Sequence, residues 1–444
     1  MSIGLATVLL FGGLIFLLAM GVPVVFALGG ISVLITFLLD GSNGLYIVAT
    51  TTYRQITDPG LITIPLFLLM GNFLIHSGIS DRLFKALNLW LSGIRGGLAI
   101  VSVGVCVALA MCGGFGPGIL TMGLIAVPAM LKHRYNKSLA LGSVMAGGVL
   151  GEIIPPSIIM IIFAYISRIS IGKIFFGGAI PGFITASLYI IYITVRCYLQ
   201  PDLAPRADEE ATLKSRVVAL KDIVSPALLI VLVLGSIFLG IATPSEAAGV
   251  GAFGSFLICI IHGRLSGKVI TNSCLETMKI SGMALWILVT ATLFGVVFTS
   301  AGAQDMLMEL IEGLTVNRWL ILVAMQLILL MFGMFMDDYA VLTICAPIFI
   351  PIAVMLGFDP TWFAIIFILN MQVAYLTPPF GWALILMKGV APPEVHTKDI
   401  WRSRRRSPGG PYQRHLAINS PIRCHTAARF NIDHVVSSTR AVAS

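Results

Sequence analysis

Long runs of apolar residues without a single charge constrain this chain more than any other feature. No charged residue occurs from Ile3 to Leu39 or from Gly96 to Leu131. As an α-helix, about 20 apolar residues cross the roughly 30 Å hydrocarbon core of a bilayer. Because 57% of the 444 residues are hydrophobic and 11% are charged, the sequence predicts an all-α polytopic membrane protein. Three further uncharged runs support this prediction: Ile174 to Val195, Ser281 to Gln304 and Pro360 to Met387.

Two pairs of consecutive prolines interrupt these apolar runs. The first pair lies in the segment from Gly151 to Ser157, and the second in the segment from Leu376 to Gly381. A proline has no N–H to donate and its ring collides with the carbonyl one turn earlier, so each pair breaks a membrane helix and frees backbone carbonyls. Free carbonyls at membrane depth are tolerated only where protein buries them or where they line a wet cavity. The sequence therefore predicts an ion or substrate site at each break.

A second unusual stretch precedes each proline pair. The first is the glycine-rich run from Gly113 to Gly118, and the second surrounds Asp337. Alone, such a glycine run is also typical of close helix packing, but its pairing with a proline break in both halves favours the tip of a re-entrant hairpin whose carbonyls can approach a cation. The predicted hairpins cover about residues 100–130 and 320–355, and the predicted broken helices cover about 138–166 and 361–387.

The two halves of the chain carry the same markers in the same order. These pairs are Pro23 with Pro244, Gly71 with Gly295, Gly78 with Gly302, Pro128 with Pro347, and Pro155 with Pro378. We therefore predict two repeats, residues 1–199 and 223–401, joined by a polar linker at 200–222. The loop after Pro128 is basic and its counterpart after Pro351 has no Lys or Arg, so the positive-inside rule predicts that the repeats are inverted.

Three acidic residues lie in these unusual segments. An aspartate at the bilayer centre costs about 3 kcal/mol on insertion scales, so we predict that Glu152, Asp337 and Asp338 face a substrate path together with Ser157 and Gln372. The alternative is that the aspartates lie in a wet surface loop. An intramembrane aspartyl protease is disfavoured because adjacent residues point apart, and we predict that the chain is not an enzyme.

The cysteines and the net charge carry no functional signal. Without a CxxC pair, the scattered cysteines predict small buried apolar side chains rather than disulfides or a metal site. The net charge is +8, but residues 402–444 hold eight Arg and one acid, Asp433, which leaves +1 for the other 401 residues. No nucleic-acid partner is therefore expected. The cysteines are Cys106, Cys112, Cys197, Cys259, Cys274, Cys345 and Cys424.

The basic tail itself, residues 402–444, contains no apolar run that could form a further spanning helix. We hypothesise that it is translated out of frame, because the segment from Ser403 to Pro411 can be encoded by a string that reads as an apolar helix start one nucleotide later. The alternative is a genuine basic cytoplasmic tail. Sequencing the gene distinguishes the two.

Together these motifs resemble the large membrane subunit, the DctM type, of the tripartite ATP-independent periplasmic (TRAP) transporters within the ion-transporter superfamily. The resemblance covers Met1 to about Trp401. The segments that carry it are Thr243 to Ala248, Leu150 to Ile158, Gly333 to Asp337, Pro347 to Pro351, Leu376 to Gly381 and Lys388 to Glu394.

The resemblance implies a sodium-driven importer in the bacterial inner membrane, with no other cofactor. A transport domain of hairpins and broken helices would move as an elevator against a scaffold. The implied partners are a periplasmic binding protein that delivers a small organic acid and a small four-helix membrane subunit of the DctQ type. The implied sodium ligands, mostly backbone carbonyls, are Cys112, Gly113, Gly114, Phe115, Gly151, Ile154 and Pro156 in the first half, and Gly333, Ala374, Thr377 and Phe380 in the second.

The chain departs from the family pattern at three of these positions. Cys112 and Phe115 replace the usual serines at the first hairpin tip, so coordination there would come from the backbone. Ala374 stands where glycine is usual. The alternative function is a stand-alone sodium/dicarboxylate symporter of related fold, which would need no binding protein.

Overall fold

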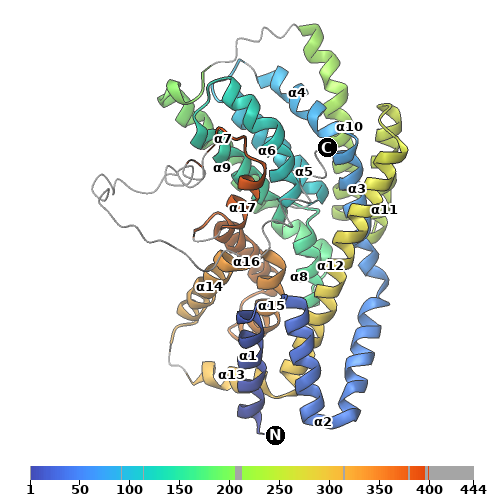
Figure 1. Ribbon diagram of the computed structural model, residues 1–444, viewed down its shortest axis with the longest axis vertical. Coiled ribbons are helices and arrows are strands. Elements are labelled where there is room, and N and C mark those ends of the chain that lie inside the picture. The colour runs from blue at the N-terminus through green and yellow to red at the C-terminus, as the bar shows by residue number, and fades with distance from the viewer. Residues whose placement is uncertain are drawn as a thin grey trace, which may run out of the picture.

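The computed structural model of the chain is almost entirely helical (Figure 1) and describes residues 2–91, 93–113, 115–205, 213–313, 316–378, 381–395 and 399. The helices of the first half are α1 (Ile3–Ala19), α2 (Val24–Ile56), η1 (Pro59–Ile62), α3 (Thr63–His76), α4 (Ile79–Leu91), α5 (Gly97–Gly113), α6 (Phe115–Lys132), α7 (Lys137–Val149), η2 (Leu150–Glu152), α8 (Ile158–Ser167) and α9 (Ile171–Leu199). The remaining helices are η3 (Pro201–Leu203), α10 (Leu213–Phe238), α11 (Pro244–Ile261), α12 (Gly267–Ser300), α13 (Ala303–Glu312), α14 (Arg318–Phe335), α15 (Asp338–Met355), α16 (Pro360–Tyr375) and α17 (Trp382–Val390).

Eight helical segments of the described chain are long and apolar enough to cross a membrane. They are α2, η1 with α3, α9, most of α10, α11, α12, α14 and α15. Their outer faces are apolar as well: Phe183 in α9 and Leu228 in α10 are 50% and 62% exposed. Large exposed apolar surfaces are stable in lipid rather than in water. The chain is therefore a multi-pass membrane protein, as its composition predicts.

Prolines mark the starts of two spanning helices that the sequence pairs. Pro23 precedes α2, and Pro244 is the first residue of α11. At α11 the Thr243 hydroxyl accepts the Glu246 N–H at 3.3 Å, and the Glu246 carboxylate accepts the Thr243 N–H at 2.8 Å. This capping box satisfies helix donors that have no partner within the helix.

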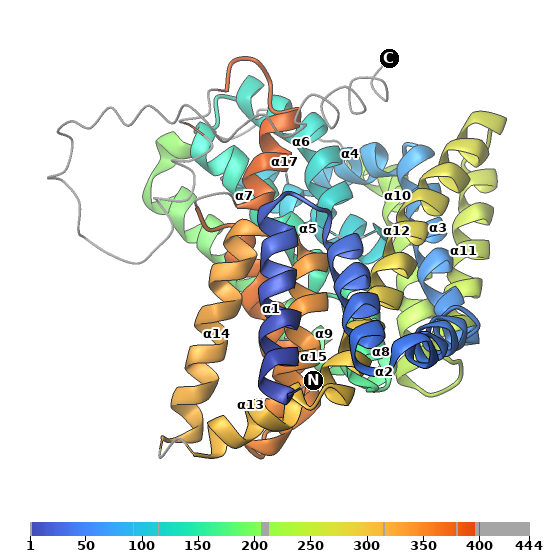
Figure 2. The same ribbon diagram turned by 60° about the horizontal axis from the view of Figure 1, so that its bottom comes forward.

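Helices from both halves of the chain form one side of the molecule. α3 packs against α11 and α12, and α2 packs against α12. Two buried polar contacts fix this packing: Asn72 Nδ2 donates to Thr277 Oγ1 at 3.0 Å, and the Thr63 and Ser245 hydroxyls are 2.8 Å apart. Figure 2 shows α3, α10 and α11 on this side and α14 on the opposite side.

The structure corrects one predicted boundary. The predicted polar linker runs to residue 222, but α10 already begins at Leu213. Side-chain contacts hold its first turns against α4: Arg216 Nε donates to the Leu89 carbonyl at 3.1 Å, and Trp90 Nε1 donates to the Arg216 carbonyl at 3.3 Å. Tertiary contacts therefore extend the helix into a charged segment. Residues 206–212 and the tail beyond 399 lie outside the described residues.

The prediction of buried cysteines is correct at four positions and wrong at Cys274. Cys274 is exposed because it lies in the polar first turns of α12. Cys112 and Cys424 lie outside the described side chains. The buried thiols are those of Cys106, Cys197, Cys259 and Cys345.

Candidate functional site

The first proline pair lies in a buried interruption between α7 and α8. α7 ends at Val149, one turn of η2 follows, and α8 begins only at Ile158. The N–H groups of Ile153 and Ile154 donate to the Leu150 carbonyl at 3.2 and 3.0 Å. The predicted ligands here, Gly151, Ile154 and Pro156, are all buried.

The glycine-rich helix pair of the first half packs against this interruption. α5 and α6 contact each other, α7 and η2. Small residues permit the close approach: a Cβ on Gly147 would lie 2.9 Å from the Val103 Cα, and one on Gly118 would lie 3.8 Å from the Gly148 Cα. Between α5 and α6, the predicted tip residue Gly114 lies outside the described residues, as do the side chains of Cys112, Gly113 and Phe115.

The second proline pair lies between α16 and α17. α16 ends at Tyr375, and α17 begins at Trp382 after Gly381, whose φ is +57°. Two backbone carbonyls face this glycine, because a Cβ placed on it would lie 3.2 Å from the oxygens of both Tyr375 and Thr377. The Thr377 hydroxyl donates to the Val373 carbonyl at 2.5 Å. The predicted ligand Phe380 lies outside the described residues.

Two further predicted ligands of the second half touch each other. Gly333 of α14 is buried, and a Cβ on it would lie 2.6 Å from the Ala374 Cβ of α16. One turn away, Asn370 Nδ2 of α16 donates to the Gln326 carbonyl of α14 at 2.6 Å. α14 and α16 are therefore held in contact directly beside the second interruption.

The two interruptions lie next to each other. α16 contacts both η2 and α8, and the Phe163 ring of α8 packs edge-on to the Phe367 ring of α16 with centroids 5.3 Å apart. α17 also contacts α6 and α7. The predicted site segments of both halves therefore form one buried region rather than two separate ones.

Predicted acidic residues from both halves also meet in this region. Glu152 of η2 and Asp338 of α15 are 1% and 5% exposed, and their charges interact electrostatically. Asp337 precedes α15 and is half-buried. The alternative that the aspartates lie in a surface loop is therefore wrong for Asp338. Ser157 and Gln372 are 1% and 3% exposed.

Three residues of this region were not predicted. The Tyr375 side chain is fully buried and interacts electrostatically with Glu152 and Asp338. Gly178 and Gly182 of α9 pack on the first interruption, where a Cβ would lie 2.9 Å from the Ile153 oxygen and 2.6 Å from the Ile154 side chain, respectively. The signal was present in the sequence, because small residues four apart are typical of close helix packing in membranes.

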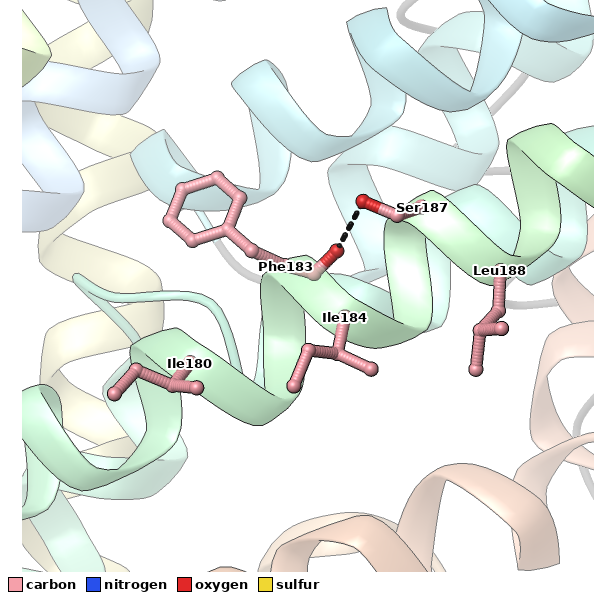
Figure 3. A pocket seen from close by; sticks show the side chains of 5 residues that line it. All are labelled: Ile180, Phe183, Ile184, Ser187 and Leu188. Carbon is pink, nitrogen blue, oxygen red and sulfur yellow. Dashed lines mark hydrogen bonds between the residues drawn. The ribbon is translucent and has the colours of Figure 1, made fainter.

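The opposite face of α9 carries a shallow apolar hollow (Figure 3). It is lined by Ile180, Phe183, Ile184, Ser187 and Leu188. Its one hydroxyl, that of Ser187, donates to the Phe183 carbonyl at 2.8 Å. Since the lining offers no charge and no free donor, it suits contact with lipid tails and not recognition of a polar substrate.

Comparison with known proteins adds a family to this geometry. Residues 11–404 match the family described as the DctM component of the tripartite ATP-independent periplasmic transporter. A C4-dicarboxylate TRAP transporter large permease protein of Pseudomonas aeruginosa is 34% identical over 365 residues, which are 81% of this chain and 84% of the relative. The corresponding protein of Vibrio cholerae is 33% identical over 413 residues, covering 87% and 90% of the two chains.

Two other similarities extend this result. The isethionate TRAP transporter permease protein DctMQ of Oleidesulfovibrio alaskensis is 32% identical over 384 residues, and the match spans 86% of this chain but only 60% of that longer relative. The crystal structure of the Alcanivorax borkumensis YdaH transporter superposes with a TM-score of 0.60 at 16% identity, covering 82% of this chain and 85% of that one. The latter similarity concerns the fold alone.

Proposed function

The chain belongs to the DctM component family of the tripartite ATP-independent periplasmic (TRAP) transporters, and on this premise we propose that it is the large subunit of a sodium-driven importer of a small organic acid. The observation that carries the proposal is the pair of buried helix interruptions, one per half, that lie side by side. Interrupted helices at membrane depth supply backbone carbonyls to cations and helix ends to substrates. The expected location is the bacterial inner membrane.

Sodium would bind where each hairpin meets the interruption of its own half. In the second half the contact of Gly333 with Ala374 and the carbonyls of Tyr375 and Thr377 support this position. Oxygen ligands suit a hard cation. In the first half Gly151, Ile154 and Pro156 would contribute with the tip from Cys112 to Phe115.

Two inverted repeats would divide into a scaffold and a moving domain. Helices α5 to α8 and α14 to α17 hold the interruptions and would form the transport domain, whereas α2, α3, α11 and α12 pack together and would belong to the scaffold. The moving domain would carry its ions and substrate across the membrane as an elevator.

Two partners complete the proposed system. Relatives named DctMQ and SiaT are longer permease proteins of which this chain spans 60% and 61%, and the name DctMQ joins a DctM part to a DctQ part. We expect a separate small subunit of the DctQ type here, and a periplasmic binding protein that delivers the substrate. Relatives are named for C4-dicarboxylate, isethionate and sialic acid transport, so the family name alone does not fix the acid.

Uptake into proteoliposomes tests this function. The chain and its small subunit are reconstituted, and a panel of radiolabelled organic acids, including succinate and amino acids, is offered with and without the binding protein under an inward sodium gradient. We expect uptake only with both the gradient and the binding protein. Equal uptake under a potassium gradient would refute sodium coupling, and uptake without the binding protein would favour the stand-alone symporter, which the comparisons do not favour.

A further inference from the structure

Unsatisfied acceptors occupy the place where the two interruptions meet. Both carboxylate oxygens of Glu152 are buried and have no hydrogen-bond partner among the described residues. The neighbouring carboxylate of Asp338 comes from the other half of the chain and is 5% exposed. Burying charged acceptors without donors is costly, so such groups usually mark a ligand site.

Unsatisfied donors accompany them. The Ser157 hydroxyl and the Gln372 Nε2 amide are buried and have no partner among the described residues. Ser157 lies in the same interruption as Glu152. Gln372 precedes Tyr375 by three residues on α16, so the two share a helix face, and the Tyr375 end of that face interacts with Glu152. The amide therefore points toward the region of the acids.

The charge of this region excludes one class of substrate. No described Lys, Arg or His forms an ion pair with Glu152 or Asp338. The basic residues nearest in sequence to the first interruption, Arg168 and Lys173, are exposed. A dicarboxylate would therefore bring two negative charges against two acids with no basic side chain to offset them, which is unfavourable in a region of low dielectric.

We propose that the chain carries a small zwitterionic organic acid, in which an ammonium, amidinium or guanidinium group accompanies one carboxylate. The cationic group donates hydrogen bonds to Glu152 and Asp338, and the carboxylate accepts them from Gln372 and Ser157. Each unsatisfied group of the region then has a partner of the right polarity. This inference rests on the proposed function and narrows its substrate class.

Thermal stability of the full-length purified chain in saturating sodium chloride tests the inference. The zwitterionic probes are β-alanine, γ-aminobutyrate and guanidinoacetate, and the matched dianions are succinate, fumarate and glutarate. A ligand that binds only the folded chain raises the melting temperature. We expect at least one zwitterion to raise it with saturation, and no dianion to do so.

Charge-removing variants assign the effect to the acids. Glu152→Gln and Asp338→Asn each keep the shape of the side chain, and we expect each to weaken binding of the zwitterion by about tenfold or more, the loss typical of a charged hydrogen bond. Glu309→Gln and Asp305→Asn make the same changes at exposed positions of α13 and should leave binding unchanged. Sodium stabilisation of the unliganded variants shows that they are folded.

The outcomes separate the inference from the proposed function. If no zwitterion stabilises the sodium-loaded chain, if a dianion does so, or if Glu152→Gln and Asp338→Asn bind the zwitterion like the wild type, the inference is overturned. A folded chain that does not respond to sodium at all refutes the proposed function instead.

Discussion

Replacing Gly333 with alanine tests whether the contact between α14 and α16 shapes the second sodium site. The new Cβ would lie 2.6 Å from the Ala374 Cβ, whereas carbon atoms in ordinary contact are about 3.5–4.0 Å apart. The helices must therefore separate by roughly 1 Å beside the carbonyls of the interruption. Overpacking of this kind typically costs about 1–3 kcal/mol.

The expected consequence is weaker sodium binding. If the whole cost falls on the ion-bound conformation, the sodium dissociation constant rises by roughly fivefold to 150-fold, since each 1.4 kcal/mol is about a factor of ten. The assay is the sodium concentration at half-maximal thermal stabilisation. Alanine also favours a helix over glycine by about 0.5–1 kcal/mol, and Gly282→Ala in α12, where nothing lies within 4 Å of the new Cβ, measures that gain alone.

A compensating substitution makes this prediction strict. Ala374→Gly removes the opposing Cβ, so the double variant Gly333→Ala, Ala374→Gly should recover most of the lost affinity, with a coupling energy of roughly 1–2 kcal/mol. Unchanged sodium affinity in Gly333→Ala, or a double variant no better than the single one, would refute the reasoning.

Further substitutions test other contacts. Thr377→Ala removes a hydroxyl of the second interruption and should lower sodium affinity by up to about tenfold, the effect of a hydrogen bond worth about 1 kcal/mol; a sodium titration of melting temperature checks this. Gly182→Val drives a branched side chain into Ile154 and should cost about 1–3 kcal/mol by overpacking, seen as a lower melting temperature with or without sodium. Asn72→Ala leaves the Thr277 hydroxyl buried without its donor and should cost about 1–3 kcal/mol while the half-maximal sodium concentration stays unchanged. An Asn72→Ala protein as stable as the wild type would contradict the role given to that hydrogen bond.

The helical membrane class and the positions of the helix interruptions could be read from the sequence. Charge-free runs leave no alternative to spanning helices, and a proline pair prevents continuous helical hydrogen bonding wherever it occurs. The structure accordingly ends α7 and α16 before Pro155 and Pro378. The inversion of the two halves and the elevator motion remain predictions.

Features set by tertiary contacts could not be read in this way. The start of α10 at Leu213 depends on its packing against α4, which local charge does not reveal. Tyr375 looked like one more residue of an apolar run, and only the packing of α16 against η2 brings it near Glu152. The closeness of Glu152 and Asp338 likewise arises from residues far apart in the chain.

Thermal stability of the purified wild-type chain against sodium concentration, with choline replacing sodium at constant ionic strength, tests the central claim most directly. It needs no knowledge of the substrate. A saturable rise in melting temperature that sodium causes and choline and potassium do not is the predicted result, because an ion bound only by the folded chain stabilises it. A folded sample whose melting temperature is the same in sodium and in choline would contradict the account.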